Sequence, residues 1–180
     1  MDVVAHGLWA GAAGMTANRK LARKIRFGWA FAWGVFPDVF AFLPMFVVLV
    51  KFRFFGQSLT PRLLFSHALQ KNLPEFLLPE GLYHLSHSLV VFSVVFALVW
   101  RLARRPALAM LAWPLHILMD IPTHGSGVYR TPFLWPLSSY RFSGIWWSQH
   151  WFMVLNYSAL AAAYMALLIL YLVSKRQPTR

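Results

Sequence analysis

Long apolar runs separated by short polar, basic segments dominate the pattern of this chain. Four runs approach or exceed the roughly 20 residues that a helix needs to cross a bilayer. They cover about residues 28–50, 82–100, 106–121 and 151–173, and the third is the shortest. The pattern predicts an all-α fold, a polytopic transmembrane helical bundle of four spans, with residues 1–180 forming a single integral membrane domain.

A fifth apolar stretch precedes these runs, at about residues 3–16. We predict a short N-terminal helix for it. A secretory signal is disfavoured, because Asp2 precedes the stretch and a basic cluster follows it.

The composition supports a membrane protein whose partner is the lipid bilayer. Hydrophobic residues make up 59% of the chain and charged residues only 12%, whereas a soluble domain averages about 25% charged residues. The chain has no cysteine, which excludes disulfides and thiolate metal sites.

The net charge of +12 arises from basic residues in short clusters between the apolar runs. Such clusters orient a multi-spanning protein, so they give no reason to expect a nucleic-acid partner. Three clusters hold most of the basic residues: Arg19, Lys20, Arg23, Lys24 and Arg26; Arg101, Arg104 and Arg105; and Lys175, Arg176 and Arg180. Four alternating spans place all three on one side. This predicts an N-terminus outside, a cytoplasmic C-terminus, and outward connections at 51–81 and 122–150.

Two of the five acidic residues, Asp38 and Asp120, lie inside apolar runs. An ionisable group at membrane depth is costly and usually marks a functional site. His116 stands four residues before Asp120, so both lie on one helix face. His84 and His87 share a face at the start of the preceding run, and both are candidate metal ligands. With the predicted direction of the spans, these histidines and Asp120 lie within about 10 Å of the outer ends of their helices.

Two imidazoles and two carboxylates suit zinc or a similar divalent metal. Such an ion lowers the pKa of a bound water toward about 7 and polarises an ester or phosphoester. We assign the catalytic roles to the two acids, with Asp38 as ligand or general base and Asp120 as ligand. Arg130 and Arg141 are candidates for binding an anionic substrate, for which a lipid is the natural choice.

The order of the short motifs resembles a known family. The motifs are AHGLWAG around His6, GVFPDVF around Asp38, YHLSHSLVV around His87, LHILMDIPTHG from His116 to His124, and PFLWPLSSYRFSG. They resemble the YdjM-like family of bacterial inner-membrane, metal-dependent hydrolases. The order of ligands is also similar to that of the zinc-dependent phospholipase C and single-strand nuclease superfamily.

The resemblance implies an enzyme of the bacterial inner membrane. It implies that Asp38, His87, His116 and Asp120 form the principal metal site. Asp120 would bridge to a second ion with His124 as a ligand, and His6 would match an early ligand of a multi-metal cluster. Three side chains, Tyr83, Ser88 and Thr123, are candidates for orienting the imidazoles.

Other classes of function remain open at this point. A transporter or proton relay would use the same acids and histidines. Haem would bind between His87 and His116 on neighbouring helices, although that leaves the acids unexplained. A membrane anchor would hold the metal only for structure. Two further histidines are predicted to lie outside the site, His67 in a solvated connection and His150 as a polar anchor at the interface.

Overall fold

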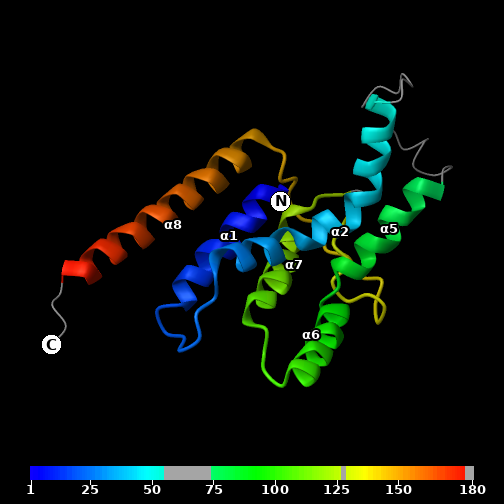
Figure 1. Ribbon diagram of the computed structural model, residues 1–180. Coiled ribbons are helices and arrows are strands. Elements are labelled where there is room, and N and C mark those ends of the chain that lie inside the picture. The colour runs from blue at the N-terminus through cyan, green and yellow to red at the C-terminus, as the bar shows by residue number, and fades with distance from the viewer. Residues whose placement is uncertain (55–73, 127–128, 177–180) are drawn as a thin grey trace.

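The computed structural model describes residues 1–54, 74–126 and 129–176 (Figure 1). All regular secondary structure in these ranges is helical, which confirms the all-α prediction. The elements are α1 (Val3–Ala17), α2 (Phe27–Phe54), α5 (Pro74–Ser86), α6 (Leu89–Ala103), the short 3₁₀ helix η1 (Leu108–Leu111), α7 (Ala112–Thr123) and α8 (His150–Arg176). His67 therefore lies outside the described residues, as does most of the connection 51–81.

The close packing of α1 on α2 builds the centre of the fold. Asp2 caps α1 by accepting a hydrogen bond from the backbone N–H of Ala5 at 2.9 Å. A Cβ atom at Gly34 of α2 would lie 2.6 Å from Cβ of Ala10 and 2.9 Å from the carbonyl oxygen of His6. The two backbones can approach this closely only because Gly34 has no side chain.

Helix α2 packs against several other elements. It contacts α1, α5 and α7, and it changes direction along its length (Figure 1). Pro37 and Pro44 lie inside it, and each proline removes one backbone donor from the helical ladder.

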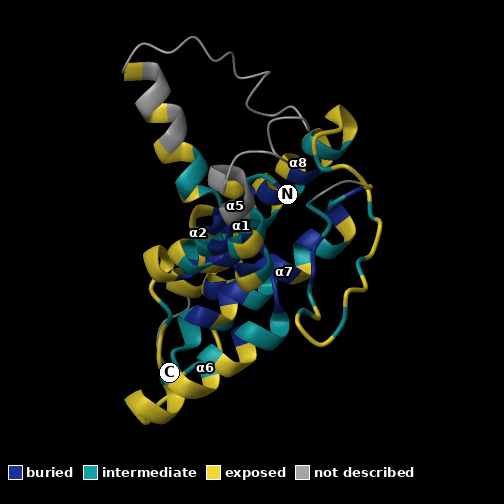
Figure 2. Cartoon of the chain, turned by 90° about the vertical axis from the view of Figure 1, so that its right-hand side faces the viewer, coloured by how far each residue is buried: buried dark blue, intermediate teal, exposed yellow. Residues whose placement is uncertain are grey.

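A break between α5 and α6 bends the chain by 60°. Ser88 caps α6 by accepting hydrogen bonds from the N–H groups of Val90 and Val91 at 3.1 Å each. Beyond the break, Phe92 of α6 packs with Trp113 and Ile117 of α7 in the main aromatic and aliphatic cluster. Buried residues gather where α1, α2 and α7 meet (Figure 2).

Two of the described helices are long and apolar enough to cross a membrane, Phe27–Val47 of α2 and His150–Arg176 of α8. A third candidate exists if the bent pair Glu80–Ser86 and Leu89–Ala103 counts as one span. These helices support membrane association, but their number is lower than the four spans predicted. The predicted span 106–121 forms η1 and α7, an apolar segment of Leu108–Thr123. At 1.5 Å per residue it is about 24 Å long, shorter than a hydrocarbon core of about 30 Å.

Candidate metal centre

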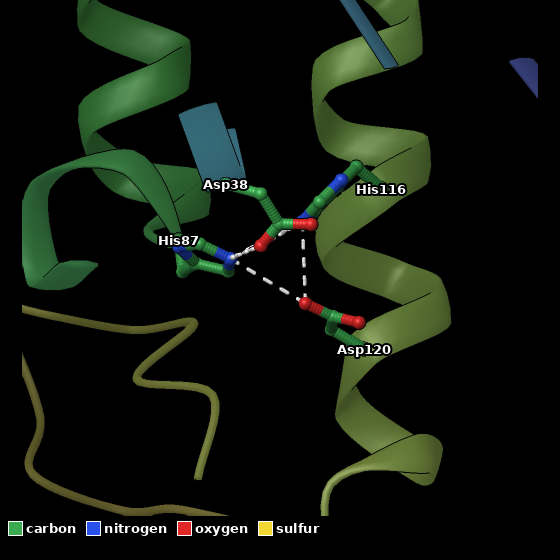
Figure 3. A group of neighbouring side chains, drawn as sticks. All are labelled: Asp38, His87, His116 and Asp120. Carbon is green, nitrogen blue, oxygen red and sulfur yellow. Dashed lines mark hydrogen bonds and ion pairs between the residues drawn. The ribbon is translucent and has the colours of Figure 1, made fainter. Parts of the chain in front are cut away.

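Three elements bring four buried side chains to one point. Asp38 comes from α2, His87 from the break between α5 and α6, and His116 and Asp120 from α7 (Figure 3). One ligand atom from each residue lies within 4.8 Å of the others. Both histidines are fully buried, and Asp120 is 1% exposed. This group can hold a metal ion.

The local structure explains how each side chain reaches the site. His116 and Asp120 lie one turn apart on the buried face of α7. His87 follows the last residue of α5, and Trp113 of α7 donates its indole N–H to the carbonyl oxygen of Ser86. This hydrogen bond ties the end of α5 to α7 and so sets His87 opposite His116.

Five of the six distances among the four ligand atoms are similar. Nε2 of His116 lies 3.2 Å from Oδ2 of Asp120 and 3.7 Å from Oδ1 of Asp38. Nε2 of His87 lies 3.4 Å from Oδ2 of Asp120 and 3.5 Å from Oδ1 of Asp38. The two Nε2 atoms are 3.2 Å apart.

Backbone carbonyls fix the other ring nitrogens. Nδ1 of His116 lies 2.7 Å from the carbonyl oxygen of Gly34, and Nδ1 of His87 lies 3.2 Å from that of Tyr83. A carbonyl oxygen only accepts, so these contacts favour the tautomer with the proton on Nδ1 and the lone pair on Nε2. Tyr83 also stacks on the His87 ring, with centroids 3.8 Å apart. This arrangement of outer contacts is typical of metal-binding histidines.

The consequence is an excess of acceptors in a buried space. In that tautomer the lone pairs of the two Nε2 atoms face each other and two carboxylates. Oδ2 of Asp38 and Oδ2 of Asp120 are buried with no hydrogen-bond partner among the described residues. Buried acceptors without donors are costly, and a cation between them offsets that cost.

The second oxygen of Asp120 faces a different set of groups. Oδ1 lies 2.8 Å from Nε2 of His6, 3.4 Å from Nδ1 of His124 and 2.6 Å from the amino group of Met1. His6 stacks on His116 with ring centroids 3.6 Å apart. Burial lowers the pKa of His6 to about 4, against the opposing charge of Asp120. Burial likewise lowers the pKa of His124. Both rings are therefore neutral near pH 7 and can act as ligands.

Other residues expected at the site lie elsewhere. His84 is half-buried, and its Nε2 lies 2.7 Å from Nη2 of Arg141, outside the group of four. Arg130 has a buried Nε with no hydrogen-bond partner among the described residues. Ser88 caps α6 and donates to the carbonyl oxygen of Trp135, so it orients no imidazole. His150 is exposed at the first turn of α8.

Among the other candidates for orienting the ligands, Tyr83 contacts His87 directly, whereas Thr123 donates to the carbonyl oxygen of Met119 at 2.9 Å. Sequence reasoning missed Gly34 and Ser86. Oγ of Ser86 lies 2.9 Å from Nδ1 of His87. Gly34 stands four residues before Asp38, hence on the same helix face, and that spacing was the available signal.

Compared with known proteins, the chain matches no family model and has no significant match among curated proteins or solved structures. The functional argument therefore rests on the geometry of the site.

Proposed function

We propose that this protein is a membrane-embedded, zinc-dependent hydrolase that cleaves a phosphoester or ester of a lipid-like substrate at the outer face of a bacterial inner membrane. The observation that carries the proposal is the convergence of two Nε2 atoms and two carboxylates in one buried space. The motif order that resembles the YdjM-like family adds support.

The ligand spacing favours zinc. A tetrahedral zinc ion with bonds of about 2.0–2.1 Å holds its ligand atoms about 3.3 Å apart. Five pairs of atoms among Asp38, His87, His116 and Asp120 lie between 3.2 and 3.7 Å apart. The donor set of imidazole nitrogen and carboxylate oxygen also suits zinc better than a hard cation that prefers oxygen alone.

A zinc ion at this point supplies a nucleophilic water near neutral pH and a Lewis acid for the scissile group. Asp38 would hold the ion through one carboxylate oxygen, and its Oδ2 has no hydrogen-bond partner among the described residues. That free oxygen can take the proton of the attacking water, which is the role of a general base. Gly34 and Tyr83 hold the two imidazoles in the ligand tautomer.

A second ion could bind the other oxygen of Asp120 in place of the Met1 amino group, which lies 2.6 Å from that oxygen. Oδ1 and Nε2 of His6 are 2.8 Å apart, and His124 lies nearby. Asp120 would then hold an ion on each side of its carboxylate, and the His6 and His124 rings would be the further ligands of the second site. Two ions would stabilise both the attacking and the leaving oxygen of a phosphoester.

The membrane setting favours a lipid-like substrate. In the proposed multi-pass arrangement the N-terminus is outside and the C-terminus is in the cytoplasm, where Lys175 and Arg176 end α8. Arg130 and Arg141 follow α7 in the connection that this orientation places outside, where they would neutralise a phosphate. Reporter fusions after Arg176 test the orientation. Activity from a reporter that works only in the periplasm would contradict this orientation.

The spacing of the histidines argues against haem. Two imidazoles that bind one haem iron from opposite sides need Nε2 atoms about 4 Å apart with a porphyrin between them. Here the Nε2 atoms of His87 and His116 are 3.2 Å apart, and each also contacts the two carboxylates.

Turnover of a panel of phospholipids and phosphodiesters tests the reaction, with metal content measured on the same samples. Asp120→Ala should lose both metal and turnover. Arg130→Gln and Arg141→Gln should keep the metal and raise KM for anionic substrates. His150→Gln serves as the control histidine, because its side chain is exposed at the start of α8. Metal retention without any turnover across the panel would favour a structural metal, and absence of bound divalent metal would refute the proposal.

A further inference from the structure

A second site lies away from the candidate metal centre, where the loop between α1 and α2 meets η1. A cavity of about 340 Å³ is lined there by Arg23, Lys24, Arg26, Trp29 and Trp33, together with apolar atoms of the η1 segment. None of the lining residues is acidic. The cavity therefore gathers three positive charges beside two indole rings.

Hydrogen bonds hold the loop in shape. Asn18 accepts from the N–H of Ile25 at 2.7 Å and donates its side-chain amide to the carbonyl oxygen of the same residue at 2.7 Å. Lys24 donates to the carbonyl oxygen of Leu21 at 2.9 Å. The side chains of Arg23 and Arg26, in contrast, form no hydrogen bond or ion pair within the part of the chain that the structure describes. The loop thus presents two guanidinium groups that its own fold does not use.

An apolar cavity of about 240 Å³ adjoins the basic one. The two share Ile25, Leu108 and Ala109 in their walls. Beyond these residues the apolar cavity is lined by small side chains of α1, including Ala10 and Ala13. A positively charged cavity that continues into an apolar one has the shape and chemistry of a site for an anionic amphiphile.

We propose that these joined cavities bind one anionic phospholipid, with its phosphate against Arg23 and Arg26 and an acyl chain in the apolar cavity. Arginine pairs with phosphate oxygens in a bidentate geometry, and basic pockets beside membrane helices are suited to anionic headgroups. Tryptophan is favoured at the level of the headgroups. The inference requires the protein to lie in a membrane, but it does not depend on the metal or on hydrolysis.

The test measures lipid binding to the full chain in detergent by native mass spectrometry. The probes are phosphatidylglycerol and phosphatidylcholine with the same acyl chains. Wild type should bind phosphatidylglycerol more tightly. Because each basic residue near an anionic lipid contributes roughly a fivefold factor, Arg23→Gln/Arg26→Gln should weaken that binding about tenfold or more. Binding of phosphatidylcholine should change little.

Arg101→Gln/Arg105→Gln is the matched control, because it removes the same charge from exposed positions outside both cavities. It should leave the affinity for phosphatidylglycerol within about twofold of wild type if distant charges contribute little. Ala13→Phe tests the apolar cavity separately and should weaken binding of phosphatidylglycerol while both arginines remain.

Three outcomes would overturn the inference. Equal losses from the two arginine pairs would mean general attraction to an anionic surface. Full competition by millimolar inorganic phosphate would mean a site for a free anion. Unchanged binding in Ala13→Phe, with the thermal midpoint of wild type, would mean that no acyl chain occupies the apolar cavity.

Discussion

Helices α2 and α8 are both long and apolar enough to cross a membrane, yet they differ in the fraction of their residues that is buried. In the most apolar window of each helix, 33% of residues are buried in α2 and 11% in α8. α2 packs against α1, α5 and α7, whereas α8 packs mainly against α1 and projects away from the rest of the fold (Figure 1).

The difference follows the interruptions in their sequences. α2 carries Gly34, Pro37 and Asp38 within one turn and a half, and each contributes to the candidate metal centre or to the packing around it. α8 contains no glycine, proline or acidic residue, and its buried residues are only Asn156 and Leu160. Mean apolarity identifies a segment that can enter a membrane. Polar and ionisable residues within an apolar helix indicate that this helix carries a functional site.

The largest expected effect is loss of metal when α2 loses its carboxylate. Replacing a residue that supports a ligand weakens metal binding roughly 10–100-fold. Asp38→Ala removes a ligand itself, so it should weaken metal binding by more than that. Elemental analysis of purified protein after exposure to a weak chelator measures this. Asn156→Ala, which removes a buried polar side chain from α8, is the matched control and should retain metal. Equal retention in both variants would refute the role of Asp38.

The second effect concerns the contact between α1 and α2. At Gly34 an added methyl group meets Cβ of Ala10 at 2.6 Å and the carbonyl oxygen of His6 at 2.9 Å, whereas at Gly28 it meets nothing within 4 Å. Gly34→Ala should therefore lower the free energy of unfolding by about 1–3 kcal/mol through overpacking. Gly28→Ala makes the same chemical change on the same helix and should be neutral or slightly stabilising. Thermal midpoints in one detergent measure both, and equal midpoints would show that the helices separate at no cost.

The four candidate ligands could be predicted from the sequence because the evidence for them is local spacing and residue chemistry. The spacing of His116 and Asp120 predicts a shared helix face, and the structure places both with Asp38 and His87. The same face rule grouped His84 with His87, but α5 ends at Ser86, so His87 lies beyond the helix and the two rings diverge.

The number of spans was less accessible to the sequence. A hydropathy window measures apolarity, and it does not report where a helix ends. The run 106–121 is apolar because α7 packs its Trp113 and Ile117 into the protein core, and the helix that forms there is shorter than a span. Long-range contacts such as that of Gly34 with His116 depend on tertiary packing, which no local pattern encodes.

A smaller effect is expected where α8 touches α1. Trp9 donates its indole N–H to Oδ1 of Asn156 at 2.9 Å. Asn156→Ala leaves this donor without its acceptor in a partly buried place and should lower the free energy of unfolding by about 1 kcal/mol. A double-mutant cycle with Trp9→Phe measures the coupling. Additive losses would mean that the hydrogen bond contributes nothing.

The smallest effect is expected on the outward side of α8. Leu168 is 50% exposed, so its side chain meets few protein atoms. If lipid or detergent covers this side, Leu168→Ala changes contacts with lipid or detergent and leaves the contacts between protein atoms almost unchanged. The free energy of unfolding should then change by less than about 0.5 kcal/mol. Thermal unfolding of the variant beside wild type in the same detergent measures the change. A loss above about 1 kcal/mol would mean that protein packs against this side, because truncation costs that much only at a buried contact. Cross-linking of purified protein would then identify the contact as a second copy of the chain, and α8 would bury a surface as α2 does.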